Sequence, residues 1–397
     1  MSKHVTELSN AQVIAAGAAS LALFGSLAAL KWAPVPYGIA ALSWSAVAVS
    51  AVFLSRRSAV RACWFNVAVA LLVLAGAEFY FASGAESDRI EYDGGYRQSH
   101  EILGYAPKPA SRSRSRRYDD EELIYDVRYT IDERGMRICP DAVSGSRSIV
   151  FFGGSFIYGE GLQDDEALPC LVGMGARGRF RVYNFGFHGY GPQQMLAALQ
   201  AGLVEEIVKE PPVVVFYQAI DDHIWRVAGL RDFGRAGPRY VLETGAKLVR
   251  RGRLRDASPR TWLRRQLRKS HVFRTIVGTP AALIRREDVE LFFAVVSAAQ
   301  DEVRAYFPGA EFYVLFWDGP GEWYQENAIE KLMNAEIQVL RVSEILPGYP
   351  QDTLAYQIGV HDRHPNRLAN DGIADYLLTV IGRRDFPDAP PSKLEDR

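Results

Sequence analysis

The chain has 397 residues, of which 48% are hydrophobic, and a formal net charge of −1 at neutral pH. It shows no internal repeat and no recognisable nucleic-acid-binding module, which excludes a repeat protein and argues against a nucleic-acid partner. The near-neutral total conceals a segregation of charge, because residues 226–274 contain fifteen Lys and Arg against three acidic residues.

Three apolar segments come first along the chain, at residues 8–30, 32–55 and 62–81, the last interrupted by Glu78. Crossing a bilayer takes about 20 residues, which the third segment also reaches if Glu78 lies at the membrane interface. None of the segments has the polar stripe of a soluble bundle. The first segment could instead be a cleaved signal peptide, but its n-region is poor, with Lys3 and His4 offset by Glu7, and two more spans follow. The sequence predicts a membrane region at residues 1–85 with three transmembrane helices.

The charged residues beside these segments predict their direction. Arg56, Arg57 and Arg61 lie between the second and third segments, whereas acidic residues dominate after the third. Positively charged loops stay in the cytoplasm, so the N-terminus is predicted inside and everything after about Ser83 outside. In a bacterium this predicts a multi-pass protein of the inner membrane with a periplasmic catalytic domain. Small residues in the first segment would let it pack on other spans or on a membrane partner.

Residues 86–147 are predicted to form a linker and edge strands. The stretch Arg112–Asp119 consists mainly of arginine and serine, which indicates a flexible linker or an exposed loop. The stretch Leu123–Gly135 alternates between apolar and polar residues and ends in a turn. That pattern is typical of strands laid against the edge of a domain.

A short apolar run, Ile149–Phe152, leads into Gly153, Gly154 and Ser155. Such a run is typical of a central parallel strand, and the glycines allow a sharp turn after it. A helix predicted at about residues 164–174 would leave Ser155 near polarised backbone N–H groups, which favour an oxyanion. A phosphate-binding loop or a plain turn is the alternative, but the Gly-Lys-Ser/Thr and G-x-G-x-x-G patterns are missing. Ser155 is the candidate nucleophile.

The partners of such a nucleophile occur much later, in residues 361–366, on a loop predicted to open the terminal helix. His364 can act as a general base, and Asp362 can hold its imidazole in the productive tautomer. The alternatives are a helix-capping or solvated His364 and an Asp362 that merely caps the helix.

After residue 148 the predicted strands alternate with helices, which is the pattern of a doubly wound parallel sheet. Ser155 and His364 follow strands or open the last helix, where such folds place ligands. Residues 148–397 are therefore predicted to form one catalytic domain, with the basic segment 226–285 as an insertion. The insertion is either a solvated surface or a surface for anionic lipid headgroups or an acidic polysaccharide.

The motifs after residue 148 resemble, in order, the blocks of the SGNH/GDSL hydrolases, a superfamily that includes esterases and O-acyltransferases. Gly153–Phe156 is similar to the first block, although Gly154 stands where the family has Asp. Asn184–Gly191 is similar to the second block, whose later glycine, here Gly189, gives a backbone N–H to the oxyanion hole. The resemblance implies a flavodoxin-like three-layer α/β fold with a parallel sheet.

Residues 362–364 resemble the last block of the family, but the third block is altered. Where the family has Gly-x-Asn-Asp, this chain has Asp221, Asp222 and His223, which puts a carboxylate where an amide donor is expected. An ionised carboxylate cannot donate a hydrogen bond to an oxyanion. Either Asp221 is protonated, or it points elsewhere, or His223 or Arg226 supplies the donor. We expect Asp221 to position His223 or Arg226.

These features predict a membrane-anchored, extracytoplasmic serine esterase or O-acyltransferase that needs no metal or organic cofactor. Its partners would be the lipid bilayer, an acylated glycan or lipid-linked substrate of the envelope or an exopolysaccharide, and an acyl donor in the membrane. Two alternatives stay open: a non-catalytic assembly or glycan-binding subunit, and a metal hydrolase that uses residues 221–223 and 361–364. Cys139 and Cys170 could pair in an oxidising compartment, whereas Cys63 lies in a predicted span.

Overall fold

The computed structural model describes residues 10–32, 35–83, 88–140, 145–276, 283–319 and 321–385. The chain divides into two compact units. A helical unit comprises residues up to 86 together with 262–283, and a larger α/β unit comprises the rest. The predicted catalytic domain included the whole basic segment 226–285, but residues 262–283 group with the N-terminal helices.

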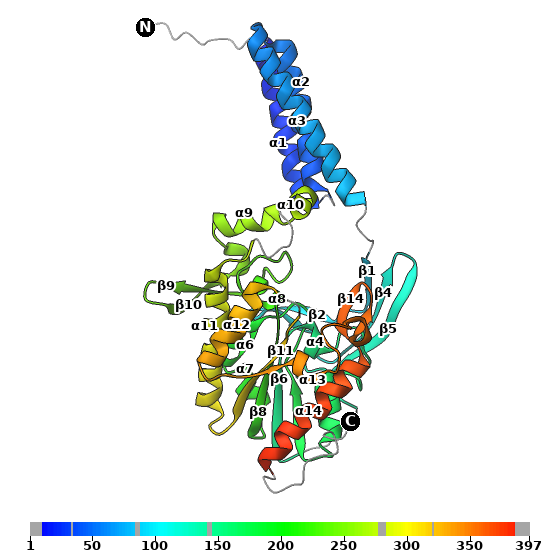
Figure 1. Ribbon diagram of the computed structural model, residues 1–397, viewed down its shortest axis with the longest axis vertical. Helices are drawn as coiled ribbons and strands as arrows, with labels where there is room; N and C mark the ends of the chain where they lie inside the picture. Colours follow the sequence, from blue (N-terminus) through cyan, green and yellow to red (C-terminus); the bar gives the residue numbers. More distant parts are fainter. Residues whose placement is uncertain are drawn as a thin grey trace. The chain divides into compact units, whose positions relative to one another are not determined.

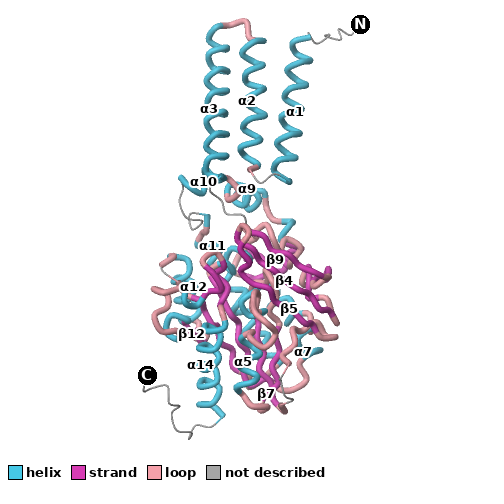
Figure 2. The backbone as a smooth tube through the Cα atoms, turned by 90° about the vertical axis from the view of Figure 1, so that its right-hand side faces the viewer, coloured by secondary structure: helices cyan, strands magenta, loops and turns pink. Residues whose placement is uncertain are grey.

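The helical unit contains α1 (Asn10–Trp32), α2 (Pro36–Leu54) and α3 (Ser58–Ser83), with α2 packed against both neighbours (Figure 2). By length and composition α2 and α3 could each cross a membrane, and α1 has a shorter apolar stretch, Gly17–Ser26, among its described side chains. The large apolar side chains of these helices that are more than half exposed are Leu21, Leu23, Phe24, Phe53, Phe65, Val73 and Tyr80. Such a surface is compatible with membrane anchoring.

The buried residues of α2 and α3 are mostly small, among them Ala41, Ala48, Ala68 and Ala75. Ser45 on α2 donates a hydrogen bond to the carbonyl oxygen of Ala68 at 3.2 Å. Small side chains let two backbones approach closely, which is how membrane helices associate in the absence of a hydrophobic driving force between them.

Glu78 of α3, which would have to lie at the membrane interface for the third segment to reach spanning length, is buried within the helical unit. Its carboxylate accepts hydrogen bonds from the hydroxyl of Ser270 and from the backbone N–H of His271 at 2.8 Å. His271 opens α10 (His271–Ile276), so Glu78 caps this short helix and ties part of the basic segment to α3.

The α/β unit is built on a five-stranded parallel sheet (Figure 1). Its strands are β6 (Arg147–Phe152), β7 (Phe180–Asn184), β8 (Pro212–Ile220), β11 (Glu311–Trp317) and β12 (Gln338–Arg341). They lie in the order β7-β6-β8-β11-β12, which is the 2-1-3-4-5 order of the flavodoxin-like fold. The predicted fold class is confirmed.

Helices cover both faces of this sheet and make the three layers. The helices α5 (Leu168–Gly175) and α14 (Arg367–Asp385) pack together on one face (Figure 1). The helices α6 (Pro192–Gln200), α11 (Arg286–Tyr306) and α12 (Trp323–Asn334) cover the other.

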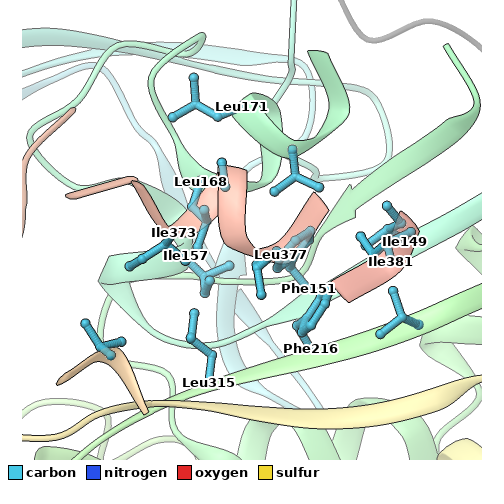
Figure 3. Packing of buried hydrophobic residues seen from close by; sticks show 14 of the residues in the cluster. Ile149, Phe151, Ile157, Leu168, Leu171, Phe216, Leu315, Ile373, Leu377 and Ile381 are labelled. Carbon is cyan, nitrogen blue, oxygen red and sulfur yellow. The ribbon is translucent and has the colours of Figure 1, made fainter. Parts of the chain in front are cut away.

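The main core lies between the sheet and the layer formed by α5 and α14 (Figure 3). Ile149 and Phe151 of β6, Phe216 of β8, Leu315 of β11 and Leu377 of α14 are each 0% exposed. Burial of one such side chain stabilises the fold by about 1.5 to 3 kcal/mol. These contacts fix the carboxyl ends of β6, β7 and β8 relative to one another, and the candidate site lies at those ends.

A second, antiparallel sheet in the order β1-β4-β5 is formed by β1 (Asp88–Asp93), β4 (Ser111–Asp119) and β5 (Glu122–Ile131). Two further strands, β2 (Arg97–His100) and β3 (Gly104–Pro107), form a separate antiparallel hairpin. The strand predicted from Leu123 onwards is β5. A satellite core of aromatic and aliphatic side chains joins this sheet to the loops of the main sheet.

The prediction of a flexible linker or exposed loop at residues 112–119 is wrong, because these residues form β4. Ser113, Ser115 and Arg117 are buried, whereas Arg114 is exposed and pairs with Asp126 on β5. Successive side chains of a strand point to opposite faces, so the alternation puts Ser113, Ser115 and Arg117 on the buried face and Arg112 and Arg114 on the exposed face.

Besides two 3₁₀ helices, Leu254–Asp256 and Leu354–Tyr356, the remaining described elements are α4 (Ser155–Tyr158), α7 (Leu203–Ile207), α8 (Asp222–Val227), β9 (Pro238–Glu243), β10 (Lys247–Arg253), α9 (Pro259–Leu267), α13 (Val342–Ile345), β13 (Gln357–Gly359) and β14 (Asp362–Pro365). Cys139 and Cys170, whose pairing the sequence left open, form a disulfide with Cα atoms 5.1 Å apart. Cys63 is free and exposed on α3.

Candidate active site

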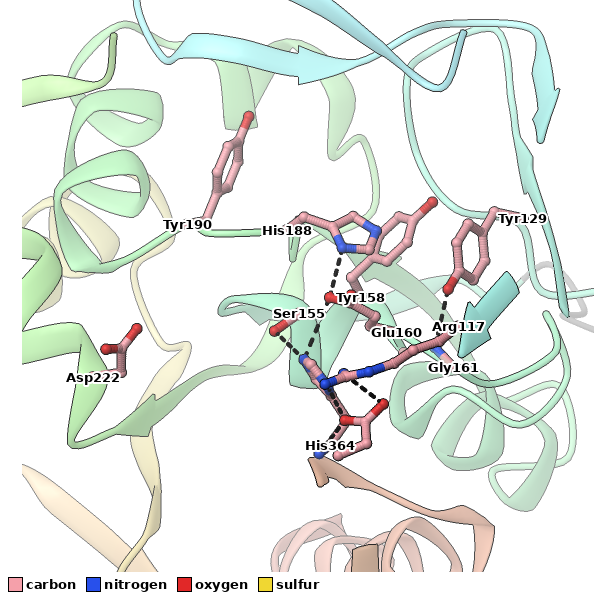
Figure 4. Close-up of polar contacts among 12 residues, drawn as sticks. Arg117, Tyr129, Ser155, Tyr158, Glu160, Gly161, His188, Tyr190, Asp222 and His364 are labelled. Carbon is pink, nitrogen blue, oxygen red and sulfur yellow. Dashed lines mark hydrogen bonds and ion pairs between the residues drawn. The ribbon is translucent and has the colours of Figure 1, made fainter. Parts of the chain in front are cut away.

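Ser155 lies where β6 ends and is the first residue of α4, a helix of four residues. The helix predicted at 164–174 starts later, at Leu168, so the N–H groups beside Ser155 belong to α4. Ser155 is 5% exposed, and its Oγ is hydrogen bonded to Nε2 of His364 at 2.8 Å (Figure 4).

The two other predicted triad residues come together on β14. The Nδ1 atom of His364 lies 2.5 Å from Oδ1 of Asp362, and the same oxygen accepts the backbone N–H of His364 at 3.0 Å. Residues two apart on a strand share a face, which explains why the spacing Asp-x-His brings these groups into contact. His361 does not join them, since its Nε2 lies 3.5 Å from Asp119. The predicted loop at 361–366 is partly strand.

Arg117 of β4 completes the support of the triad, and the sequence did not reveal it. Its Nη1 lies 2.8 Å from Oδ2 of Asp362, and its Nη2 donates to the carbonyl oxygen of His361 at 3.1 Å. Asp362 is 1% exposed, and a buried carboxylate is costly unless a positive charge faces it. The inward direction of Arg117 could have been predicted from the alternation of residues 112–117, which places Arg117 on the same face as Ser113 and Ser115.

Glu160 is a second residue that sequence reasoning missed (Figure 4). It is buried, its Oε2 lies 2.7 Å from Nδ1 of His188, and the same oxygen lies 3.3 Å from Nε2 of His364. The chain turns through Gly159 and Gly161, both with positive φ, to place it there. The sequence feature that could have indicated Glu160 is a carboxylate between two glycines in an otherwise apolar run.

The carboxylates around His364 set its protonation. Burial lowers the pKa of His364, but Glu160 and Asp362 outweigh burial and raise the pKa to about 10. Burial likewise raises the pKa of Glu160, but His188 and His364 outweigh it and hold that pKa well below its usual range. His364 is therefore an imidazolium at neutral pH in this arrangement, and it must lose this proton before it can act as a base.

The second block braces the nucleophile turn. Asn184 donates from Nδ2 to the carbonyl oxygen of Ile157 at 2.9 Å and accepts the backbone N–H of Gly186 at 2.9 Å, so it acts as a structural tie. Gly189 has φ +72°, and a Cβ on it would lie 2.8 Å from the hydroxyl of Tyr105. Only glycine fits at this position.

The third block differs from the prediction. Asp221 contacts the hydroxyl of Tyr324 at 3.3 Å, and burial, followed by the neighbouring Asp222, raises its pKa. The expectation that Asp221 positions His223 or Arg226 is wrong, because Asp222 does so: its Oδ2 accepts from Nε of Arg226 at 2.6 Å. Asp222 also pairs with Arg231. The local polar network exists, but its centre is the second aspartate.

Within the part of the chain that the structure describes, no three His, Cys, Asp or Glu side chains are grouped to hold a metal ion. Residues 221–223 and 361–364, which a metal hydrolase would use, do not converge on one point. Asp221 and Asp222 contact Tyr324 and Arg226, whereas Asp362 and His364 contact each other, with Arg117 and Ser155 beside them.

No protein-family model matches the chain, and no curated protein is similar to it in sequence. Among solved structures it is similar to a lipolytic protein of the G-D-S-L family from Desulfitobacterium hafniense DCB-2, with 13% identity, a TM-score of 0.35, and 59% of this chain and 98% of that chain covered. It is also similar to the acetyl xylan esterase Est2A from Butyrivibrio proteoclasticus, with 11% identity, a TM-score of 0.35, and 61% and 65% covered.

A carbohydrate esterase family 2 enzyme with a carbohydrate-binding domain from Corynascus thermopiles has 14% identity and a TM-score of 0.34, with 75% and 86% covered. The structural neighbours are therefore esterases and lipases, several of them of the GDSL/SGNH hydrolase family. At this level of similarity the function proposed below rests on the geometry of the site.

The pH dependence of ester hydrolysis tests the role of Glu160. A base with a raised pKa gains its neutral form as pH rises, so kcat/KM should increase with pH until about 10. Glu160→Gln removes a negative charge from Nε2 of His364, which lowers the pKa of His364 and should move the midpoint of the profile to lower pH. Glu330→Gln, an exposed substitution on α12, is the matched control. An unmoved midpoint in Glu160→Gln would contradict this assignment.

Proposed function

We propose that the chain is a serine ester hydrolase or O-acyltransferase. The observation that carries the proposal is the continuous contact from Ser155 Oγ to His364 Nε2 at 2.8 Å and from His364 Nδ1 to Asp362 Oδ1 at 2.5 Å. A nucleophile, a base and a carboxylate that orients the base are the parts that acyl transfer requires.

The reaction has two steps. Neutral His364 takes the proton of Ser155 as Oγ bonds to the acyl carbon, and it then gives this proton to the departing alcohol oxygen. In the second step water or a second hydroxyl loses its proton to His364 and attacks the acyl group, which frees Ser155. If water accepts the acyl group the protein is a hydrolase, and if another hydroxyl accepts it the protein is an O-acyltransferase. Asp362 stabilises the imidazolium that forms in both steps, and Arg117 balances the charge of Asp362.

A non-catalytic subunit on the same fold would not need these contacts. The buried Arg117–Asp362 pair and the short contact of Asp362 with His364 cost desolvation, and the orientation of a base gives both contacts a role. This consideration favours an enzyme over an assembly or glycan-binding subunit.

The same proposal includes an anchor in the inner membrane and a catalytic unit outside the cytoplasm. It is supported by the apolar surfaces of α2 and α3 and by Arg56 and Arg57 between them. The Cys139–Cys170 disulfide also suits an oxidising compartment.

The proposed substrate is an acyl ester of an envelope glycan or exopolysaccharide, reached from the membrane surface. A polytopic anchor keeps an enzyme beside a membrane-bound substrate or acyl donor. Lys and Arg outnumber acidic residues fifteen to three in residues 226–274. Exposed arginines of this segment include Arg251 and Arg255, although Arg251 pairs with Glu243 and Arg255 lies 3.8 Å from Asp256. An exposed positive surface attracts acidic glycans and anionic lipid headgroups.

Removal of either reacting group tests the enzyme. Ser155→Ala and His364→Ala should each lower ester turnover on the order of 10⁴- to 10⁶-fold, and the double variant should be scarcely worse, because the members act as a unit. A chelator should have no effect. The measurement is steady-state hydrolysis of p-nitrophenyl acetate by the full chain in detergent, with circular dichroism to check folding. Full activity of folded Ser155→Ala would refute the proposal.

Reporter fusions test the orientation. A reporter that is active only in the periplasm should work when it is fused after Asp93 and fail when it is fused at Ser58, since the arginines hold the α2–α3 loop inside. A cytoplasmic reporter at the same two positions is the control and should give the opposite pattern. Periplasmic activity at Ser58 alone would place the candidate site in the cytoplasm and remove the glycan proposal.

A further inference from the structure

The altered third block leaves the oxyanion hole without its usual side-chain donor, and the structure contains a candidate to replace it. His223 of α8 is 0% exposed. Its Nδ1 is hydrogen bonded to the hydroxyl of Tyr217 at 2.7 Å. Its Nε2 has no hydrogen-bond partner among the described residues. Burying a polar atom without a hydrogen-bond partner costs free energy, so we expect this nitrogen to hydrogen bond to a ligand.

The location of this nitrogen points to the nucleophile turn. A Cβ built on Gly154, the residue before Ser155, would lie 3.0 Å from Nε2 of His223 and 2.6 Å from Nη1 of Arg226. The imidazole and the guanidinium therefore occupy the space that a side chain at position 154 would need. The glycine that stands at 154, where the SGNH/GDSL pattern has aspartate, therefore leaves room for two side chains that follow the altered third block.

We propose that the Nε2–H group of His223 is the side-chain donor of the oxyanion hole, beside the backbone N–H groups of Ser155 and Gly189. This inference rests on the proposed acyl-transfer function of the same site. His223 then binds the carbonyl oxygen as it becomes negative during attack, which is the task of the asparagine amide in the resembled family. Asp221, turned to Tyr324, takes no part.

The surroundings of His223 hold the imidazole in the form that this task requires. Burial, followed by the positive charge of Arg226, keeps the pKa of His223 well below its usual value, so the ring is neutral. A neutral imidazole carries one proton, and the Tyr217 hydroxyl, when it donates to Nδ1, leaves that proton on Nε2. Tyr217 is therefore a positioning residue that selects the donor tautomer.

Arg226 is a second positioning residue. Its Nε donates to Asp222 at 2.6 Å, and its Nη1 donates to the carbonyl oxygen of Tyr190 at 2.5 Å. These contacts fix α8 to the second-block loop that carries Gly189. Fixed donors cost no reorganisation when charge develops, which is why an oxyanion hole accelerates the reaction.

The test compares His223→Phe with His223→Gln by steady-state hydrolysis of p-nitrophenyl acetate. Loss of one oxyanion donor should lower kcat about 10²- to 10³-fold in His223→Phe and leave KM nearly unchanged. His223→Gln should recover much of this loss, because its amide can donate from a similar position. His100→Phe on β2 is the control substitution and should keep the wild-type kcat.

The outcomes separate this inference from the proposed function. If wild type is active and Ser155→Ala is inactive, a wild-type kcat in His223→Phe overturns the inference alone. Equal losses in His223→Phe and His223→Gln also overturn it, because packing would then explain both. If His223→Phe does not fold, Tyr217→Phe is measured instead. Its kcat should be about tenfold lower than that of the wild type, and an unchanged kcat overturns the inference. An active Ser155→Ala would instead refute the proposed function itself.

Discussion

The hydrogen bond between His364 and Ser155 depends on residues from three separate parts of the fold. The parallel sheet presents Ser155 at the end of β6, and β14 carries His364 and Asp362 on one face. The antiparallel sheet, which is not part of the main sheet, supplies Arg117 to the far side of Asp362. Because each contact fixes the next, a shift of β4 would reach the nucleophile through Arg117, Asp362 and His364.

Charge balance is the second constraint on the site. On one side His364 faces two buried carboxylates, Asp362 and Glu160, which together favour its protonated form. On the other side burial, followed by the positive charge of Arg226, keeps the pKa of His223 well below its usual value. The chemistry proposed for Ser155 needs His364 after it has lost its extra proton, as the base, and His223 in its neutral form, as a hydrogen-bond donor.

The sequence predicted the sheet and the contact of Ser155 with His364 and Asp362 because both depend on local patterns: apolar strands, a glycine turn and a short Asp-x-His spacing. It missed Arg117 and Glu160, since their roles arise from contacts far apart along the chain. The arginine- and serine-rich β4 looked like a linker because its inward face is lined by small serines and one paired arginine rather than by apolar side chains. The position of Arg226 was predicted to depend on Asp221, whereas Asp222 contacts it. Two adjacent aspartates cannot be distinguished by sequence, because the start of α8 determines the direction of each side chain.

The central claim is that Ser155 is a nucleophile activated by His364. The most direct test is intact-mass and peptide analysis of the full chain after reaction with a fluorophosphonate, which forms a stable bond with an activated serine hydroxyl. One phosphonyl group per chain is expected, located on Ser155, and almost none in folded His364→Ala. Ester turnover by the wild-type chain without labelling of Ser155, or equal labelling in His364→Ala, would contradict it.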